Sequence, residues 1–138
     1  MRDWSWSGLL LVLVCLSCTR AANGPPLFPV KGHVFYESKP ANGAVVILHS
    51  TGNRVNASRP RGRADATGAF ELTTYETGDG AAAGEYVVTV EWKRAEDHPE
   101  QGTELLPPVY GDPKTSKLSV TVTPGVNEPL ILRLTARP

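Results

Sequence analysis

The feature that most constrains the fold is an alternation of apolar and polar residues that recurs from residue 30 to the C-terminus. It is clearest in Glu85–Lys93, where four large apolar side chains share one face: Tyr86, Val88, Val90 and Trp92. Burying each such side chain stabilises a fold by roughly 1.5–3 kcal/mol. Because successive side chains of a β-strand point to opposite faces, the pattern predicts a strand with one buried side. No segment shows the 3.6-residue apolar stripe of a helix.

The same alternation predicts six further strands. They are Val30–Tyr36, Ala44–His49, a short one near Arg61–Ala64, Phe70–Tyr75, Lys117–Thr123 and Pro129–Thr135. We expect the first two of these to pair with each other, and the turn at Thr123–Asn127 to close a hairpin between the last two. The 13 glycines and 12 prolines suit many turns and do not suit long helices. Seven short strands at this spacing predict an all-β fold, a β-sandwich.

Residues 1–18 are predicted to be an export signal. The apolar run Gly8–Leu16 is too short to cross a bilayer core of about 30 Å as a helix, and its length is typical of a signal peptide. Leu16-Ser17-Cys18 resembles the end of a bacterial lipoprotein signal, in which the cysteine is lipidated and becomes the N-terminus, although Cys15 stands where that motif usually has leucine. We favour this interpretation over ordinary cleavage near Thr19–Ala22, which would release a soluble protein.

The chain then divides into the signal (1–18), a flexible linker (19–29) and one folded domain (30–136). Both cysteines, Cys15 and Cys18, fall in the signal region, so the mature domain has no disulfide, thiolate metal site or nucleophilic cysteine. The 14 basic residues are balanced by 14 acidic ones, which excludes the basic surface that nucleic-acid binding requires. Two long connections, 50–60 and 94–115, are interpreted as solvated loops in preference to functional ones.

A turn motif and three further blocks carry a family resemblance. Asp65, Gly68 and Phe70 form an Asp-x-x-Gly-x-Phe turn, in which the aspartate can accept backbone hydrogen bonds and the glycine can take positive φ. The blocks are Thr74–Gly80, Gly84–Val90 and Tyr110–Ser116. In this order they resemble small bacterial secreted or lipoprotein members of the carboxypeptidase regulatory-like domain family.

The resemblance implies a seven-stranded, transthyretin-like (prealbumin-like) sandwich with an Ig-like Greek key. The family domain lies beside metallocarboxypeptidase catalytic domains and is not itself the peptidase. We therefore expect a non-enzymatic exported domain without a cofactor, anchored by lipid on Cys18 at the inner or outer membrane and facing the periplasm or exterior. Its partner is expected to be a protein or a cell-envelope component. A secreted soluble form is the alternative.

Two alternatives from other functional classes stay open. A transthyretin-related hydroxyisourate hydrolase uses histidine and arginine, with which His33 and Arg61 or Arg63 are comparable, but its Tyr-Arg-Gly-Ser tail is absent from this C-terminus. A carbohydrate-binding module needs exposed aromatic residues. Trp92 alternates with core residues and is expected in the core, whereas Phe35 and Tyr75 are expected on the opposite faces of their strands.

Metal sites are weakly indicated. The histidines His33, His49 and His98 lack the i, i+2 or i, i+4 spacing that directs two rings to one metal. The acidic turns Gly78–Gly80 and Tyr110–Pro113 lack the alternating carboxylates that would supply the 6–8 oxygen ligands of calcium. We interpret both as turn geometry.

Overall fold

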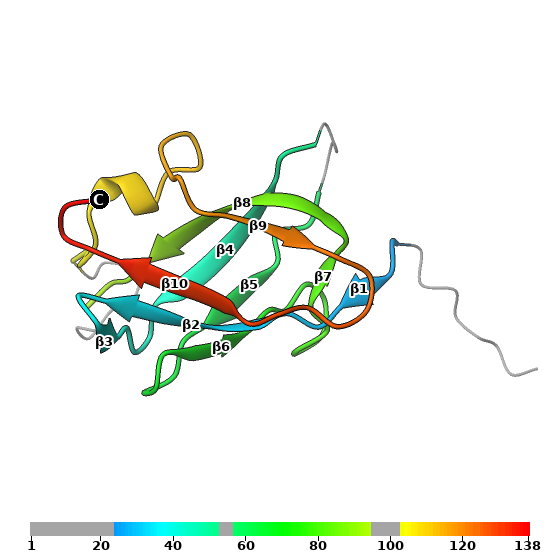
Figure 1. The fold of residues 1–138 in the computed structure, drawn as a ribbon, viewed down its shortest axis with the longest axis horizontal. Helices are drawn as coiled ribbons and strands as arrows, with labels where there is room; N and C mark the ends of the chain where they lie inside the picture. The colour runs from blue at the N-terminus through cyan, green and yellow to red at the C-terminus, as the bar shows by residue number, and fades with distance from the viewer. Residues whose placement is uncertain (1–23, 53–56, 95–102) are drawn as a thin grey trace, which may run out of the picture.

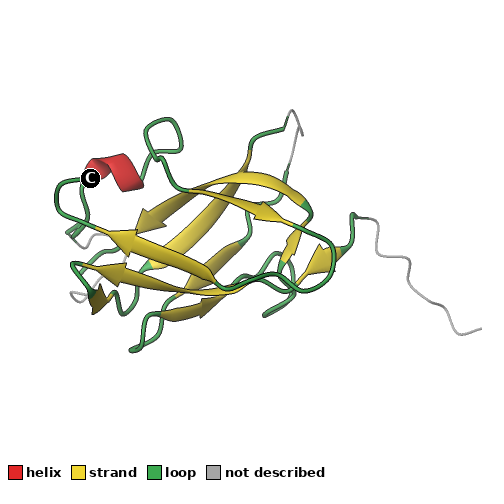
Figure 2. Ribbon diagram, in the orientation of Figure 1, coloured by secondary structure: helices red, strands yellow, loops and turns green. Residues whose placement is uncertain are grey.

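The computed structural model describes residues 24–52, 57–94 and 103–138, and apart from one short 3-10 helix the regular elements of these residues are all β-strands, joined by loops (Figure 2). They form ten strands, where the sequence predicts seven, and three of the ten are only two residues long. The strands are β1 (Leu27–Phe28), β2 (Lys31–Tyr36), β3 (Lys39–Pro40), β4 (Val45–Ser50), β5 (Arg61–Arg63), β6 (Ala69–Glu71), β7 (Ala81–Ala82), β8 (Gly84–Glu91), β9 (Ser119–Val122) and β10 (Leu130–Leu134). One 3-10 helix, η1, spans Pro108–Tyr110.

Two four-stranded sheets make up most of the fold (Figure 1). The first has the order β10-β2-β3, with β6 also pairing with β2, and the second has the order β5-β4-β8-β9. The pairs within them are antiparallel except β10 with β2, which is parallel. The short strands β1 and β7 form a separate antiparallel pair. This arrangement is consistent with a β-sandwich.

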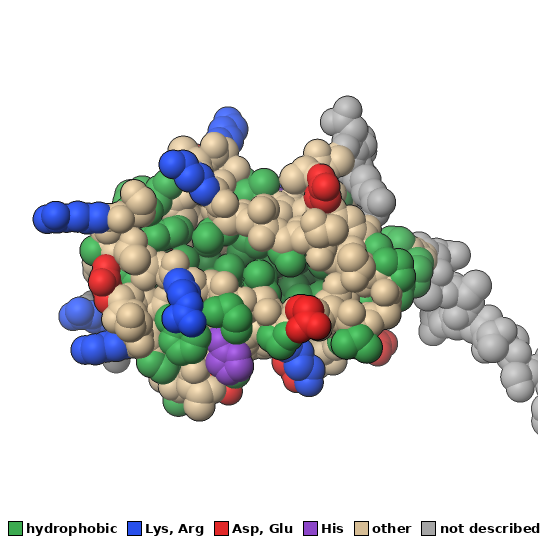
Figure 3. Space-filling model, in the orientation of Figure 1, with side chains coloured by type: hydrophobic (Ala, Val, Ile, Leu, Met, Phe, Trp, Pro, Cys, Tyr) green, Lys and Arg blue, Asp and Glu red, His purple; other side chains and the backbone are tan. Residues whose placement is uncertain are grey.

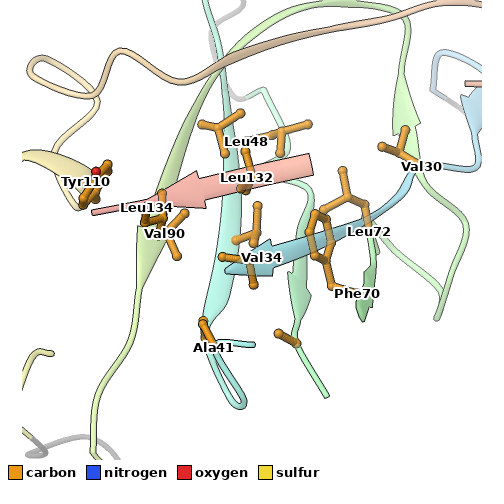
Figure 4. Close-up of a cluster of buried hydrophobic side chains, with 14 of the residues drawn as sticks. Val30, Val34, Ala41, Leu48, Phe70, Leu72, Val90, Tyr110, Leu132 and Leu134 are labelled. Atoms are coloured by element: carbon orange, nitrogen blue, oxygen red, sulfur yellow. The ribbon is translucent and has the colours of Figure 1, made fainter. Parts of the chain in front are cut away.

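The hydrophobic core lies between the two sheets (Figure 4). The first sheet contributes Val34, Leu132 and Leu134, and the second contributes Leu48 and Val90, all buried. Their neighbours on each strand are more exposed, as the sequence predicts, except Thr89 beside Val90, which is also buried. The core of a cysteine-free domain therefore depends on this interdigitation of aliphatic side chains.

Two predicted strand pairings are wrong. Strand β2 does not pair with β4: it lies in the first sheet beside β10 and β6, while β4 lies in the second sheet beside β5 and β8. Likewise, β9 and β10 do not form a hairpin, because β9 pairs with β8 and β10 pairs with β2. Each of these connections crosses from one sheet to the other. Alternation indicates which face of a strand is buried. It does not indicate whether a second strand pairs with it in the same sheet or packs against it across the core, because both arrangements bury the same face.

The predicted flexible linker extends too far toward the domain. Residues Leu27 and Phe28 pair with Ala82 and Ala81 as part of the fold. Gly80, with φ +87°, permits this approach, since a Cβ there would collide with the carbonyl oxygen of Phe28. The predicted signal peptide and Cys18 lie outside the described residues.

The described part of the second long connection packs against the domain, contrary to the prediction of a solvated loop. Leu106 and Tyr110 are buried in the core. The Tyr110 hydroxyl accepts a hydrogen bond from the Thr135 amide at 3.0 Å, which ties η1 to the end of β10. The Glu104 carboxylate accepts the amide N–H of Trp92 at 2.9 Å. Residues 95–102 of this connection, and 53–56 of the first, lie outside the described residues.

Candidate functional site

An open groove of about 860 Å³ lies at the corner where the first sheet meets the second. This volume is in the range of small-molecule binding sites, about 300–1,000 Å³. Its walls come mainly from β2, β5 and β6, all of which are strands. The lining residues are Lys31, Gly32, His33, Val45, Arg61, Gly62, Arg63, Asp65, Ala69, Phe70, Glu71, Thr73, Thr77, Gly78 and Pro129.

The groove follows from a hairpin whose two strands join different sheets. At one end, Arg61 and Thr73 exchange backbone hydrogen bonds of 3.0 and 2.8 Å. At the other end, the Asp65 amide donates to the Ala69 carbonyl at 2.9 Å. Between these two sets of hydrogen bonds the strands separate: β5 pairs with β4 in the second sheet, and β6 pairs with β2 in the first. The corner is therefore held at both ends by backbone hydrogen bonds.

Two glycines set how closely the strands approach at this corner. A Cβ on Gly62 would collide with the carbonyl oxygen of Glu71 and lie 3.2 Å from Cδ2 of Phe70. A Cβ on Gly32 would lie 2.7 Å from Cζ of Phe70 and collide with the carbonyl oxygen of Leu130. The buried Phe70 ring therefore lies against strands of both sheets at positions that accept only glycine.

The turn between β5 and β6 closes one end of the groove. Asp65 Oδ1 accepts hydrogen bonds from the Thr67 amide (2.8 Å), the Thr67 hydroxyl (2.6 Å) and the Ala69 amide (3.1 Å). Gly68 has φ +82° and donates its amide to the Asp65 carbonyl at 2.9 Å. The hydroxyl and then the amide of Thr67 are the main groups that hold the pKa of Asp65 below its ordinary value. Its carboxylate thus organises the turn.

The charges in the groove are unevenly neutralised. Lys31 Nζ and Glu71 Oε1 form an exposed ion pair at 2.8 Å. Arg63 Nε donates to the Gly43 carbonyl at 3.3 Å. Among the described residues, neither Arg61 nor Arg63 has an ion-pair partner. Three cations (Lys31, Arg61, Arg63) face two carboxylates (Asp65, Glu71), and one carboxylate is already paired.

His33 lies where the groove meets the outer face of the first sheet. Its ring is parallel to that of Phe35, with centroids 6.1 Å apart and an interplanar angle of 7°. The guanidinium of Arg133 lies 5.7 Å from the Phe35 ring centroid, within cation–π range. Figure 3 shows a histidine on this face beside basic and hydrophobic side chains. His33 lines the same groove as Arg61 and Arg63.

The other histidines lie elsewhere or outside the described residues. His49 Nε2 lies 2.8 Å from Thr89 Oγ1 on the second sheet. Burial, followed by the charge of Arg59, lowers the pKa of His49, and Glu91 opposes this effect. His98 lies outside the described residues. Within the described ranges, no group of three or more His, Cys, Asp and Glu side chains is placed to hold a metal ion.

The acidic turns use their carboxylates for backbone hydrogen bonds. Asp79 accepts three amide N–H groups, from Thr74 at 2.6 Å, Tyr75 at 2.9 Å and Glu76 at 2.8 Å. Burial raises the pKa of Asp79, but these hydrogen bonds outweigh it, so that the pKa is lowered overall. Asp112 accepts the Lys114 amide at 2.8 Å. Both are the contacts of structural turns.

Trp92, which the sequence predicts in the core as part of a strand, lies instead just beyond the end of β8. Trp92 is half-buried against the core, its Nε1 donates to the Asn42 carbonyl at 2.8 Å, and it meets Tyr36 edge-on with centroids 5.8 Å apart. Tyr75 is 68% exposed. Of Trp92 and Tyr75, Tyr75 is the more accessible side chain.

Sequence reasoning missed the groove itself. The Asp65–Phe70 motif identifies the turn between β5 and β6, but no motif indicates that β2 lies beside them. The signal that could have found it is the alternation of Arg61 and Arg63 around Gly62, which places two cations on one side of a strand and a glycine on the other.

Comparison with known proteins identified no relative. No protein-family model matches the chain, and neither the curated proteins nor the solved structures that were searched contain a match. Within the described ranges, no helix combines the length and hydropathy needed to cross a bilayer.

Proposed function

We propose that the chain is a non-enzymatic, exported bacterial binding domain, anchored to a membrane by lipid on Cys18, that presents the β2–β5–β6 groove to a component of the cell envelope. The groove is the observation that carries the binding role. It has the volume of a ligand site, about 860 Å³, and its walls are strands of two sheets joined by backbone hydrogen bonds. Rigid walls of this kind reduce the ordering cost of binding.

The side chains around the groove favour binding over catalysis. The hydroxyl of Thr73 accepts the Gly78 amide at 3.0 Å, and the Asp65 carboxylate accepts the bonds that form the turn. The ring of His33 stacks beside Phe35. The Thr73 hydroxyl and the Asp65 carboxylate are engaged in holding the local structure, while the guanidinium groups of Arg61 and Arg63 have unused donors facing the groove.

The anchor is tested by fractionating cells that produce the chain or its Cys18→Ser variant. We expect the unmodified chain in the membrane fraction and the variant in the soluble exported fraction. A chain that is soluble with and without the substitution contradicts the anchor.

The binding role is tested by photo-crosslinking in cells. A photoreactive residue in place of Thr77, which lines the groove, should give an adduct of defined mass. The same residue in place of Lys114, an exposed turn position outside the groove, is the matched control. Equal adducts at both positions, or none at Thr77, contradict a role for the groove.

A hydrolase of the transthyretin-related type is the second candidate, because His33, Arg61 and Arg63 line one groove. Turnover of hydroxyisourate by the purified protein, abolished by His33→Ala, would support it. A rate of hydroxyisourate breakdown equal to that in buffer alone excludes the hydrolase candidate.

A further inference from the structure

Two arginines project from one side of β5 at the groove. Arg61 and Arg63 are separated by one residue on the strand, so their side chains leave the same face at a spacing of about 6.6–6.8 Å. Both residues are exposed, and both line the groove. In the part of the chain that the structure describes, the acidic residues beside them are already engaged: Glu71 pairs with Lys31, and Asp65 accepts bonds from its own turn.

The floor beneath these cations is apolar. Val45, Ala69, Phe70 and Pro129 contribute to it, and Gly62 adds backbone without a side chain. An inorganic anion would contact the arginines and leave this floor in water. A ligand with an apolar body would cover it and gain roughly 25 cal/mol for each Å² of apolar surface removed from water.

We propose that the β2–β5–β6 groove binds a small organic anion, a carboxylate or phosphate group carried on an apolar or aromatic body. This inference rests on the proposed function, since it names the ligand class of the same groove. The planar guanidinium forms paired hydrogen bonds to carboxylate or phosphate oxygens. Arg61 and Arg63 have guanidinium donors for such bonds, although Arg63 Nε already donates to the Gly43 carbonyl.

The charge count favours a small ligand over a polyanion. Three cations against two carboxylates leave a formal excess of one positive charge in the groove. A sulfated glycan or an acidic protein segment gains affinity by engaging many cations along its length. One or two negative charges on a compact body match this groove better.

The test is a titration of the purified exported protein, with its anchor in non-ionic detergent, followed by amide NMR. The probes are phenyl phosphate and benzoate. Inorganic phosphate, which has the negative charge without the aromatic ring, and benzyl alcohol, which has the ring without the charge, are the comparisons. We expect phenyl phosphate to shift the amides of Gly62, Glu71 and His33, with a Kd at least tenfold lower than that of inorganic phosphate. Benzyl alcohol should cause no shift at these amides.

The arginines are tested by variants in the same titration. Arg61→Gln combined with Arg63→Gln should raise the Kd for phenyl phosphate at least tenfold, whereas Lys114→Gln, which removes a cation elsewhere, should leave it unchanged. If the double variant does not fold, Arg61→Lys alone should weaken binding, because it keeps the charge and loses the paired geometry.

Three results would overturn the inference: shifts confined to other parts of the domain, a Kd unaffected by the double variant, or binding of dextran sulfate or polyglutamate in the absence of phenyl phosphate binding. The last would assign the groove to an acidic glycan or an acidic protein. Failure here leaves the Cys18→Ser fractionation and the Thr77 crosslink unaffected, so the two proposals fail separately.

Discussion

The carbonyl oxygen of Glu71 occupies the space that a Cβ on Gly62 would need. The contact joins β6 of the first sheet to β5 of the second at the groove, and the buried Phe70 ring lies beside it. Because the obstructing atom belongs to the backbone, a side chain at Gly62 cannot be accommodated by a rotamer change. The strand separation at the candidate site is therefore sensitive to a single methyl group.

Gly62→Ala is accordingly expected to destabilise the domain by about 1–3 kcal/mol, the usual cost of forcing extra atoms into a packed site. Gly111→Ala is the matched control, since the nearest atom to its Cβ is 3.8 Å away and its φ is −90°. Urea unfolding measured by circular dichroism gives both free energies. Equal midpoints for the two variants would contradict the close contact at Gly62.

The Asp79 turn should depend on its carboxylate. Asp79→Ala leaves three amide donors without their acceptor and is expected to cost about 1–3 kcal/mol, whereas Asp79→Asn, which keeps one carbonyl oxygen, should cost less. The pKa of Asp79 is lowered in the fold, so its contribution is present above the ordinary pKa of 3.8 and is lost as the pH falls through the folded value. Unfolding free energies of the three proteins between pH 2 and 6 measure this. If the unfolding free energies of the unmodified protein and Asp79→Asn changed in parallel with pH, the ionised Asp79 carboxylate would not be the source of this stability.

The burial of individual strand faces could be predicted from the sequence. In β8, Tyr86, Val88 and Val90 are buried as the alternation indicates. Thr89 is the exception on the opposite face, with 1% exposure, and its hydroxyl meets His49 of the neighbouring strand. Alternation describes one strand at a time, so it does not predict that a side chain of the neighbouring strand buries a residue.

The strand partners and the groove could not be predicted in this way. The parallel pairing of β10 with β2 joins the two ends of the domain, and no local turn specifies it. The groove arises because the β5–β6 hairpin divides between two sheets, which is a property of the assembled sandwich. Parts of the groove can nonetheless be recognised in the sequence: Asp65 and Gly68 identify the turn, and Arg61 and Arg63 identify a charged strand face.

His49 should make stability depend on pH in the mildly acidic range. Its pKa is lowered in the fold, so the unfolded chain binds the proton more readily once the pH falls below the ordinary value of 6.5. Stability is therefore fully present above pH 6.5 and decreases as the pH falls toward the folded pKa. Urea unfolding at several pH values should show this slope, and His49→Gln should reduce it.

Three neighbours of His49 test the cause of that slope. Burial is the largest effect on its pKa, so Thr89→Val, which removes the hydroxyl contact and keeps the side chain's size, should retain the slope. Arg59→Gln should reduce it, because the arginine charge also lowers the pKa. Glu91→Gln should steepen it, because the carboxylate raises the pKa. A slope unchanged by His49→Gln would assign the titration to another group.

Adjacent residues of β10 test the orientation of the parallel strand. Leu132 is 3% exposed and packs in the core, so Leu132→Ala is expected to cost about 2–5 kcal/mol through lost burial and the cavity left behind. Ile131 is 47% exposed on the opposite face, and Ile131→Ala should cost less than about 1 kcal/mol. Thermal and urea unfolding of the two variants compare the faces directly. Because a shift of one residue in the pairing of β10 with β2 would exchange the two faces, a larger loss for Ile131→Ala than for Leu132→Ala would show that the register Leu132 to Val34 is wrong.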